Sequence, residues 1–418
     1  MSTNAHPQSG ATEAGQAPLV SILIPTYNRA EYLDDCLHSV LCQDFRDFEV
    51  VIRDNCSTDN TDSVVKKYES KFNIGPNYRY IRNETNVGFR QNLRDGITQD
   101  CRGKYCINLH DDDFFLNEKL LSHYVNILES NPNVSFVCSF PLKYDQDVET
   151  VSAKDLIAEH LKDQIAVGRL NIDGRDYFLN FWTKYPVINF SATLFKTKLA
   201  VDRNWVDYGC LDQSLALLLS AGNEVVFVRD SLTAYRMHTS PERGNVTWRV
   251  TGLPVEAALE SHDAIEKWVS FSRSSLGLSR LSALVWRLKT LISKEGYTIG
   301  ILHNEDGDKD IEFLRGVKKR SLFHYLVLRW LEPTKISLDA ASGPKNPIAR
   351  VLHQAIILLR RRASALLVGL DRVMHDPDHN LSPGQALRWV FTGSSRKANN
   401  GATHDHDGEK LESRAPDA

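Results

Sequence analysis

Short apolar runs alternate with stretches of helical spacing between residues 18 and 110. Apolar side chains recur every three to four residues between the runs, and Ser57-Thr58-Asp59 supplies N-cap chemistry for one of the intervening helices. This strand–helix rhythm predicts an α/β fold with a Rossmann-like, mainly parallel sheet and helices on both faces. The four runs that predict strands are Leu19–Ile24, Phe48–Ile52, Tyr78–Ile81 and Tyr105–Leu109.

Further elements are predicted beyond residue 110. Residues 251–392 carry few strand signals and several amphipathic patterns, so we expect a C-terminal α-helical region there. The polar segments 1–17 and 393–418 are expected to be disordered, which leaves 18–250 as the main domain. The elements predicted in that domain are helices at 117–130 and Leu211–Leu219, and strands at Val134–Phe140, Ile188–Phe195 and Glu224–Val228.

Polar clusters directly follow three of the predicted strands. They are Thr26-Tyr27-Asn28, Asp54-Asn55 and Asp111-Asp112-Asp113. The carboxyl ends of parallel strands share one edge of a sheet, and ligands of open α/β sheets bind in the crevice there. We therefore expect the three clusters, far apart in sequence, to converge in space.

Composition restricts the class of protein. The chain has 418 residues, of which 42% are hydrophobic, and its formal net charge of −3 gives no support for a nucleic-acid partner. Residues 1–17 lack the pattern of a signal peptide, and no uncharged apolar stretch approaches the roughly 18–20 residues of a membrane span. Seven scattered cysteines without a CxxC pair favour reduced thiols. These features predict a cytoplasmic protein.

The C-terminal helical region is basic. Residues 315–372 contain twelve Lys and Arg but only three Asp and Glu. Three interpretations stay open: a solvated helical face, peripheral docking on the anionic inner face of the cell membrane, or an interface with a partner or a second copy.

The Asp111–Asp113 triplet is a candidate metal site. Adjacent carboxylates repel one another unless a cation is present, and hard oxygen ligands suit Mg²⁺ or Mn²⁺. Such an ion can bridge to a diphosphate and neutralise charge on a leaving group. A solvated acidic loop is the alternative, which the position after an apolar strand and beside two other polar clusters disfavours.

Four segments resemble family 2 glycosyltransferases, which have the GT-A fold. Together they cover residues 18–130 in the family's order and spacing. They are VSILIPTYNRAEYLDDCLHSVLCQ, VIRDNCSTDNT, NETNVGFRQNLRDGI and YCINLHDDDFFLNEKLL. The resemblance implies a sugar transferase that uses a nucleotide-sugar donor and a divalent metal.

The resemblance also implies roles for individual residues. Donor binding is expected from the following residues: Pro25, Thr26 and Tyr27 against base and ribose, Asp54 on the base, Asn86 and Arg90 at diphosphate or sugar, and Asp111 and Asp112 near ribose and metal. Asp112 and Asp113 are the expected metal ligands, with His238 near the metal. Many members have an Asp at the position of His110, so the register of the metal-binding pair stays open.

Some of these residues also fit simpler roles. Tyr27 could be a packing aromatic, Asp54 could cap the following turn, and Arg90 could be a solvated helix residue. His238 could be a lone surface histidine.

The segment WVDYGCLDQSLALLLSAG resembles the acceptor side of the family's site. Inverting transfer needs a carboxylate that takes a proton from the acceptor hydroxyl, and Asp212 matches that base. A plain N-cap aspartate is the alternative, and Asp207 is the reserve candidate.

These expectations define an inverting glycosyltransferase. We expect it to transfer a sugar from a nucleotide sugar to a hydroxyl of a glycan or lipid-linked acceptor, and the resemblance suggests bacterial surface polysaccharide or lipopolysaccharide synthesis. One alternative is a nucleotidyltransferase, which normally has a Gly-rich phosphate loop where this chain has PTYNRAEY. The other is a catalytically inactive nucleotide-sugar-binding scaffold.

Overall fold

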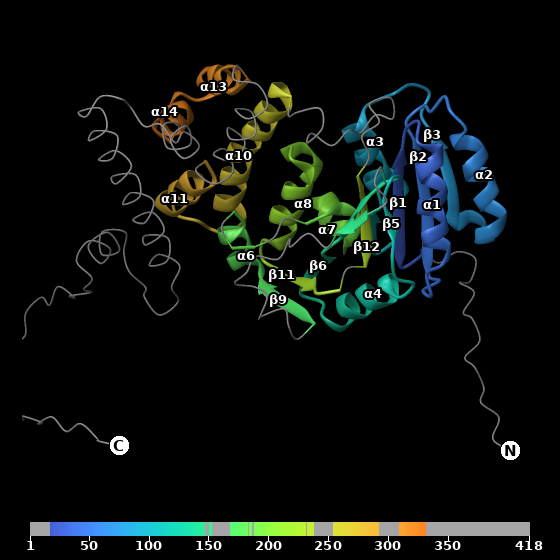
Figure 1. The fold of residues 1–418 in the computed structure, drawn as a ribbon. Coiled ribbons are helices and arrows are strands. Elements are labelled where there is room, and N and C mark those ends of the chain that lie inside the picture. Colours follow the sequence, from blue (N-terminus) through green and yellow to red (C-terminus); the bar gives the residue numbers. More distant parts are fainter. Residues whose placement is uncertain are drawn as a thin grey trace, which may run out of the picture. The chain divides into compact units, whose positions relative to one another are not determined.

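A computed structural model describes most of the chain between residues 17 and 331 (Figure 1). All described residues lie in the first of two units, Met1–Ile357. The described residues are 17–146, 150–152, 168–182, 184–185, 188–230, 232–237, 254–291 and 309–331.

An eight-stranded sheet forms the centre of this unit. Its order is β3-β2-β1-β4-β10-β6-β11-β9, and parallel pairs dominate, with β10 and β9 running antiparallel to their neighbours. The strands are β1 (Val20–Thr26), β2 (Phe48–Asp54), β3 (Tyr78–Arg82), β4 (Tyr105–Asn108), β6 (Val134–Ser139), β9 (Arg169–Asp173), β10 (Thr193–Lys196) and β11 (Glu224–Val228).

A second, smaller sheet has the order β5-β12-β7-β8. Its short strand β5 follows the Asp triplet directly, so this sheet supports the loop that carries the triplet. Its strands are β5 (Phe114–Phe115), β7 (Leu142–Asp145), β8 (Thr150–Ser152) and β12 (Thr233–Met237).

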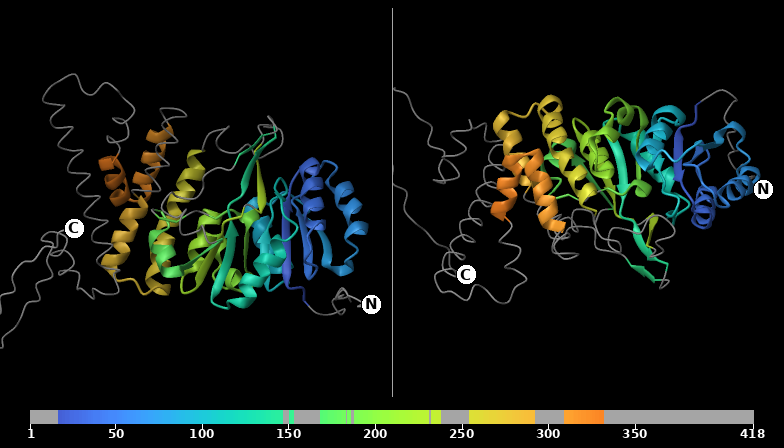
Figure 2. Two further views of the ribbon diagram at one scale, coloured as in Figure 1. Left: turned by 60° about the horizontal axis from the view of Figure 1, so that its bottom comes forward. Right: turned by 90° about the horizontal axis from the view of Figure 1, so that it is seen from above.

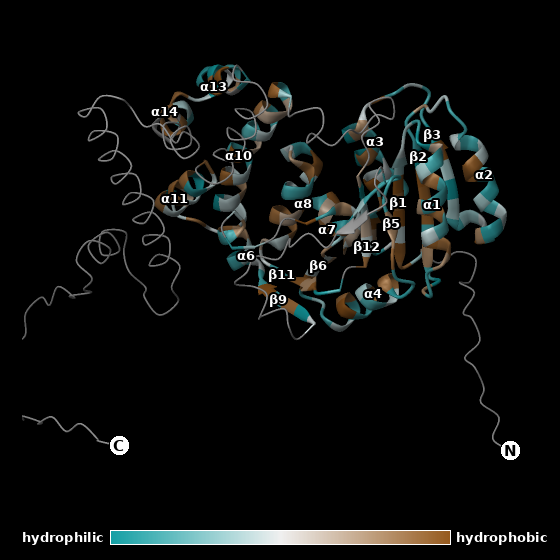
Figure 3. Cartoon of the chain, viewed as in Figure 1, coloured by the Kyte–Doolittle hydropathy of each residue, from teal (hydrophilic) through white to brown (hydrophobic). Residues whose placement is uncertain are grey.

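Helices cover both faces of the large sheet (Figure 2). The helices α1 (Ala30–Leu41), α2 (Thr61–Phe72) and α4 (Leu120–Ser130) contribute to one hydrophobic core. The other face packs against α3 (Phe89–Asp95), α6 (Gly174–Asn180), α7 (Thr197–Asp202) and α8 (Leu211–Ser220). Every residue of β1 and β2 is buried, as expected of strands covered on both faces. Figure 3 shows the matching pattern, with hydrophobic strands and helices striped by hydropathy.

The C-terminal helices extend this arrangement. They are α10 (Val255–Ser275), α11 (Arg280–Thr290), α13 (Lys309–Arg320) and α14 (Leu322–Leu331). Trp268 of α10 and Trp286 of α11 are fully buried in the core that contains α8. Within the described part of the chain, no helix has both the length and the apolar character required to cross a bilayer.

The predicted architecture is confirmed: a Rossmann-like, mainly parallel sheet has helices on both faces, and helices follow it in the C-terminal part that the structure describes. The Ile188–Phe195 strand is wrong in part, because Phe190–Ala192 forms a 3-10 helix and β10 starts only at Thr193. The N-cap predicted within residues 57–59 is wrong, because the helix begins at Thr61 and Asn60 is its N-cap residue; the backbone N–H of Thr61 donates to Asp59 (3.1 Å). The boundaries at 17, 250 and 392 stay predictions. Residues 393–418 and His238 lie outside the described residues.

Candidate active site

The loops after the parallel strands meet at one edge of the sheet. In the β1 loop, the backbone N–H of Asn28 donates to the Ser57 hydroxyl (2.9 Å), and the N–H of Thr58 donates to the Asn28 side chain (2.7 Å). Asn28 has a φ of 53°, a left-handed conformation that asparagine tolerates better than most residues. The β1 and β2 loops are therefore joined at the edge predicted from the sequence.

The Asp triplet is buried beside an arginine of the β1 loop. The guanidinium of Arg29 donates to Asp111 (2.8 Å) and to Asp112 (2.9 Å), and all three aspartates are less than a tenth exposed. Asp113 accepts from the Ser191 hydroxyl (2.5 Å) and from the backbone N–H of Arg236 (3.0 Å). The triplet is thus buried and held by ion pairs and hydrogen bonds, so the alternative interpretation as a solvated acidic loop is wrong.

Burial makes the charges of the triplet costly. It raises the pKa of Asp111 to about 6, although Arg29 acts in the opposite direction, and it raises the pKa of Asp113 well above the ordinary value, with Asp112 adding repulsion. The guanidinium of Arg29 is ion-paired to Asp111 and Asp112. A divalent cation would supply the missing positive charge.

The residues present fit such a cation. One ligand atom each from His110, Asp112 and Asp113 lie within 4.8 Å of one another. Burial lowers the pKa of His110, so that its imidazole is neutral and able to ligate at pH 7. His110, Asp112 and Asp113 therefore form a candidate metal site, of which the sequence predicted Asp112 and Asp113.

Arg236 lies behind the acidic loop. Its Nε donates to the carbonyl of Asp112 (2.8 Å), while a terminal nitrogen pairs with Asp35 (2.8 Å). The guanidinium carbon is 5.1–5.4 Å from the ring centroids of Tyr32, Phe114 and Tyr144. Arg236 also lines an open cleft of about 800 Å³ on the α1 side of the loop. Its charge is thus directed at Asp35 and the aromatic rings.

The expected nucleotide side is only partly open to a ligand. Tyr27 is 41% exposed at the end of β1, so part of its ring is accessible for stacking on a base. Thr26 is the neighbour of Asp54 in the sheet register. Asp54 is buried and accepts from the Ser57 N–H (2.8 Å) and the Tyr80 hydroxyl (2.6 Å). The turn-capping role of Asp54 is therefore present in the structure.

Asn86 belongs to a network of amide side chains. Its oxygen accepts from Asn55 (2.7 Å) and from the backbone N–H of Gly88 (2.9 Å), and the Asn55 oxygen accepts from the N–H of Val87 (2.9 Å). These bonds shape the loop that leads into α3. Arg90, at the start of α3, forms an ion pair with Glu260 of α10.

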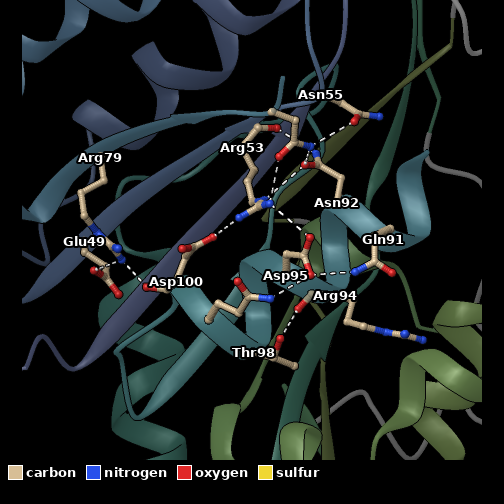
Figure 4. Close-up of polar contacts among 12 residues, drawn as sticks. Glu49, Arg53, Asn55, Arg79, Gln91, Asn92, Arg94, Asp95, Thr98 and Asp100 are labelled. Carbon is tan, nitrogen blue, oxygen red and sulfur yellow. Dashed lines mark hydrogen bonds and ion pairs between the residues drawn. The ribbon is translucent and has the colours of Figure 1, made fainter. Parts of the chain in front are cut away.

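A buried arginine anchors this loop from below (Figure 4). Arg53 donates to Asn92 (3.2 Å) and pairs with Asp95 (3.3 Å) and Asp100 (2.5 Å). Asp100 ends a π-helical turn, Gly96–Asp100, that continues α3. The network fixes the position of α3 under the Asn86 loop.

Asp212 lies in the first turn of α8. Cys210 is the N-cap residue, so the simple N-cap interpretation of Asp212 is wrong. The carboxylate accepts from the N–H of Gln213 (2.8 Å), and burial raises its pKa. A short turn, 221–223, joins α8 to β11, so the helix runs back along the sheet. Its first turn therefore lies toward the carboxyl ends of the parallel strands, as does the triplet.

The reserve candidate Asp207 is engaged elsewhere. Its carboxylate bonds to Arg94 and Asn204, and its carbonyl accepts from Lys267 of α10. These contacts hold the segment before α8 against α3 and α10. Asp207 is therefore bonded to side chains of neighbouring elements, whereas Asp212 accepts from the backbone N–H of Gln213.

A family model described as glycosyl transferase family 2 matches residues 21–198, the segment that contains these strands, the amide network and the acidic triplet. In this segment the chain is therefore similar to glycosyl transferase family 2.

Three curated relatives carry related names. The chain is 33% identical over 119 residues to the poly(ribitol-phosphate) beta-N-acetylglucosaminyltransferase TarS of Staphylococcus aureus, covering 28% of this chain and 20% of TarS. The putative teichuronic acid biosynthesis glycosyltransferase TuaG of Bacillus subtilis is 33% identical over 119 residues, which cover 28% of this chain and 46% of TuaG. The abequosyltransferase RfbV of Salmonella typhimurium is 36% identical over 104 residues, which cover 24% of this chain and 30% of RfbV. The chain spans less than half the length of each.

Two solved structures are also similar. S. aureus TarS 1–349 in complex with UDP-GlcNAc gives a TM-score of 0.43 at 18% identity, covering 72% of this chain and 91% of that one. The mannosyltransferase PcManGT from Pyrobaculum calidifontis, in complex with GDP-Man and Mn²⁺, gives a TM-score of 0.44 at 18% identity. The match covers 84% of this chain and 87% of PcManGT.

Sequence reasoning missed three residues of this site. Arg29 carried a weak signal, a lone cation after the first strand, and the structure shows that it bridges two aspartates. Ser191 gave none, because the 3-10 helix that presents it was predicted as strand. His110 was noticed only as a departure from the family's usual Asp.

Proposed function

We propose that the protein is an inverting, metal-dependent glycosyltransferase that uses a nucleotide-sugar donor. The observation that carries the proposal is the buried Asp111–Asp113 cluster, in which Arg29 is the ion-paired cation, at the strand edge toward which Asp212 also lies. Carboxylates in this number are stable only beside a cation, and that cation would bring a diphosphate to the same edge.

Each part of the site has a role in this proposal. Tyr27 stacks on the base at the exposed end of β1, and the Asn55–Asn86 network holds the loop beside the diphosphate in one conformation. Asp112 and Asp113 would hold Mg²⁺ or Mn²⁺, which when bound neutralises charge on the departing diphosphate. Arg29 keeps the two neighbouring carboxylates oriented before the donor arrives.

Asp212 is the proposed general base. A carboxylate whose pKa is raised by burial accepts a proton more readily than an exposed one. It takes the proton of the acceptor hydroxyl while the hydroxyl oxygen attacks the anomeric carbon and the bond to the diphosphate breaks. Attack from the face opposite the leaving group inverts the anomeric configuration.

The acceptor is proposed to be a glycan or a lipid-linked sugar in bacterial surface polysaccharide synthesis. Support comes from the names of the relatives, which include teichuronic acid biosynthesis and abequosyl transfer. We also propose a cytoplasmic location with peripheral contact to the inner face of the membrane.

A surface on the C-terminal helices supports the membrane contact. Leu322 and Leu326 of α14 are 59% and 57% exposed, and the preceding turn carries exposed Lys318 and Lys319. Apolar side chains next to lysines suit an anionic lipid surface. The full chain should float with vesicles of 30% anionic lipid, and a Leu322→Glu, Leu326→Glu variant should not. The matched control is Leu284→Glu on α11, 38% exposed. Equal flotation of all variants would contradict the contact.

The donor is tested by thermal shift. The full chain is screened against UDP-GlcNAc, GDP-mannose and other nucleotide sugars, with Mn²⁺ or EDTA, because ligand that binds the native state raises Tm. We expect at least one donor to stabilise the protein only with the metal, and the same donor to be turned over with release of the nucleoside diphosphate. Stabilisation by nucleoside triphosphates with pyrophosphate release would instead indicate a nucleotidyltransferase. Binding without turnover of any donor, across a panel of sugar acceptors, would indicate an inactive scaffold.

A further inference from the structure

We propose that His110 is a direct ligand of the metal at the acidic loop, and that its imidazole makes the site prefer Mn²⁺ to Mg²⁺. The inference rests on the proposed metal-dependent function. It concerns a residue that stands where many relatives of this family have an Asp.

The His110 ring is held in a defined place. Its backbone N–H donates to the Ser191 hydroxyl (3.1 Å), which ties the residue to the same serine that bonds Asp113. The ring centroid is 5.7 Å from that of Phe89 and 5.8 Å from that of Phe190. Contacts with two aromatic side chains restrict the orientation of the ring and so of each ring nitrogen, which a metal ligand requires.

One nitrogen of this ring lacks a protein partner. His110 Nε2 is buried and makes no hydrogen bond to any residue that the structure describes. Buried polar atoms are nearly always satisfied, so this nitrogen is available to a bound ion or water. A ligand atom of His110 lies within 4.8 Å of ligand atoms of Asp112 and Asp113. The three residues can therefore surround one ion.

The neighbours of the carboxylates act as a supporting shell. Arg29 holds Asp112, while Ser191 and the backbone N–H of Arg236 hold Asp113. Bonds of this kind orient metal ligands and tune their affinity. A nitrogen added to two oxygens changes selectivity, because Mg²⁺ requires oxygen ligands and keeps its waters, whereas imidazole suits transition ions.

The test measures metal binding by the full chain directly. Free Mn²⁺ is followed by EPR during titration, and the bound ion is examined by electron spin-echo envelope modulation, which detects ¹⁴N bonded to manganese. Wild type should show imidazole ¹⁴N coupling. His110→Leu, which keeps the contacts with the two phenylalanines, should lose the coupling and bind Mn²⁺ at least about 10-fold more weakly.

Two further variants complete the design. His110→Asp replaces the nitrogen by oxygen, so it should still bind metal, lose the ¹⁴N coupling, and show a ratio of Mn²⁺ to Mg²⁺ affinity about 10-fold lower than wild type. His123→Leu removes an exposed histidine of α4 and should leave every value unchanged.

Three results would overturn the role of His110. They are ¹⁴N coupling that persists in both His110 variants, oxygen-only coordination in wild type, or no Mn²⁺ binding by wild type. Oxygen-only coordination together with metal-dependent turnover of a nucleotide sugar would refute the role of His110 as a metal ligand and leave the proposed function standing. If the protein bound neither Mn²⁺ nor Mg²⁺ and turned over no nucleotide sugar, both the role of His110 and the proposed function would be refuted.

Discussion

Two acidic sites of this protein differ in how their charges are compensated. The triplet at the end of β4 is surrounded by Arg29, Ser191 and the backbone of Arg236, while Asp212 accepts from the backbone N–H of the next residue. Burial raises the pKa of Asp111, Asp113 and Asp212 alike.

The difference separates two tasks. Carboxylates that share an arginine and a serine are held rigidly, which suits binding of a metal and a diphosphate. A half-buried carboxylate in the first turn of a helix, bonded to a backbone N–H, suits repeated uptake and release of a proton. Variants should therefore affect stability most at the triplet and turnover most at Asp212.

The largest change in stability is expected from Arg29→Met. The guanidinium is 7% exposed and pairs with two carboxylates, so its loss leaves them buried without that cation. We expect the free energy of unfolding to fall by about 3–5 kcal/mol in EDTA, measured with urea. Mn²⁺ should restore part of the loss. The control Lys66→Met breaks an exposed pair with Asp62 and should cost less than about 1 kcal/mol. If Arg29→Met lowered the free energy of unfolding no more than Lys66→Met, the triplet would not depend on Arg29 to compensate its charge.

The pH dependence of stability should reveal the cost of Asp111. Its pKa is about 6 in the folded state against an ordinary 3.8, so the folded state binds the extra proton between these values. Its contribution therefore makes the metal-free protein less stable as pH rises from about 4 to 6, by about 1.4 kcal/mol per pKa unit.

The variant Asp111→Asn isolates this contribution from those of other carboxyls. The stability of the variant relative to wild type, measured with urea in EDTA, should rise across the window from about pH 4 to 6. Saturating Mn²⁺ should reduce the rise, because a bound cation favours the ionised carboxylates. A flat or falling difference would contradict the raised pKa.

A smaller effect is expected in the amide network. Asn55→Ala removes the donor to Asn86 and the acceptor for Val87, leaving polar groups unpaired. We expect a loss of about 1–3 kcal/mol in unfolding free energy and weaker donor binding. Asn126→Ala, at an exposed site on α4, should change stability by no more than about 0.5 kcal/mol. Unchanged donor affinity would remove the network from the binding site.

The smallest effect should appear behind Asp212. Trp268 of α10 donates from its indole nitrogen to the Ser214 hydroxyl (2.9 Å) in α8. A double-mutant cycle of Trp268→Phe and Ser214→Ala should give a coupling of about 1 kcal/mol. Zero coupling would mean that α10 does not support the helix that carries Asp212.

The first half of the fold was predictable because its strands and loops have clear signals in the local sequence. All residues of β1 and β2 are buried, so their apolar runs are continuous, and the polar loops follow at the strand ends. The convergence of those loops followed from the geometry of parallel sheets. In contrast, Phe190–Ala192 has an apolar character that fits a strand as well as a 3-10 helix, and only its tertiary contact with Asp113 distinguishes them.

The site itself was predictable as residue types but not as pairings. The triplet was recognisable, whereas its bond to Arg29 joins residues 82 positions apart in the sequence. Asn86 and Arg90 were expected at the donor, and the structure shows Asn86 bonded to Asn55 and Arg90 paired with Glu260. Long-range pairings of this kind carry no local signal in the sequence.

The central claim is that the triplet binds the donor and Asp212 removes the acceptor proton. The direct test compares Asp212→Asn with wild type for metal-dependent donor binding, by thermal shift, and for sugar transfer, by release of nucleoside diphosphate. The account predicts an unchanged shift and a transfer rate lower by about 10²–10⁴-fold, the usual contribution of a general base. Equal transfer by both proteins would contradict it.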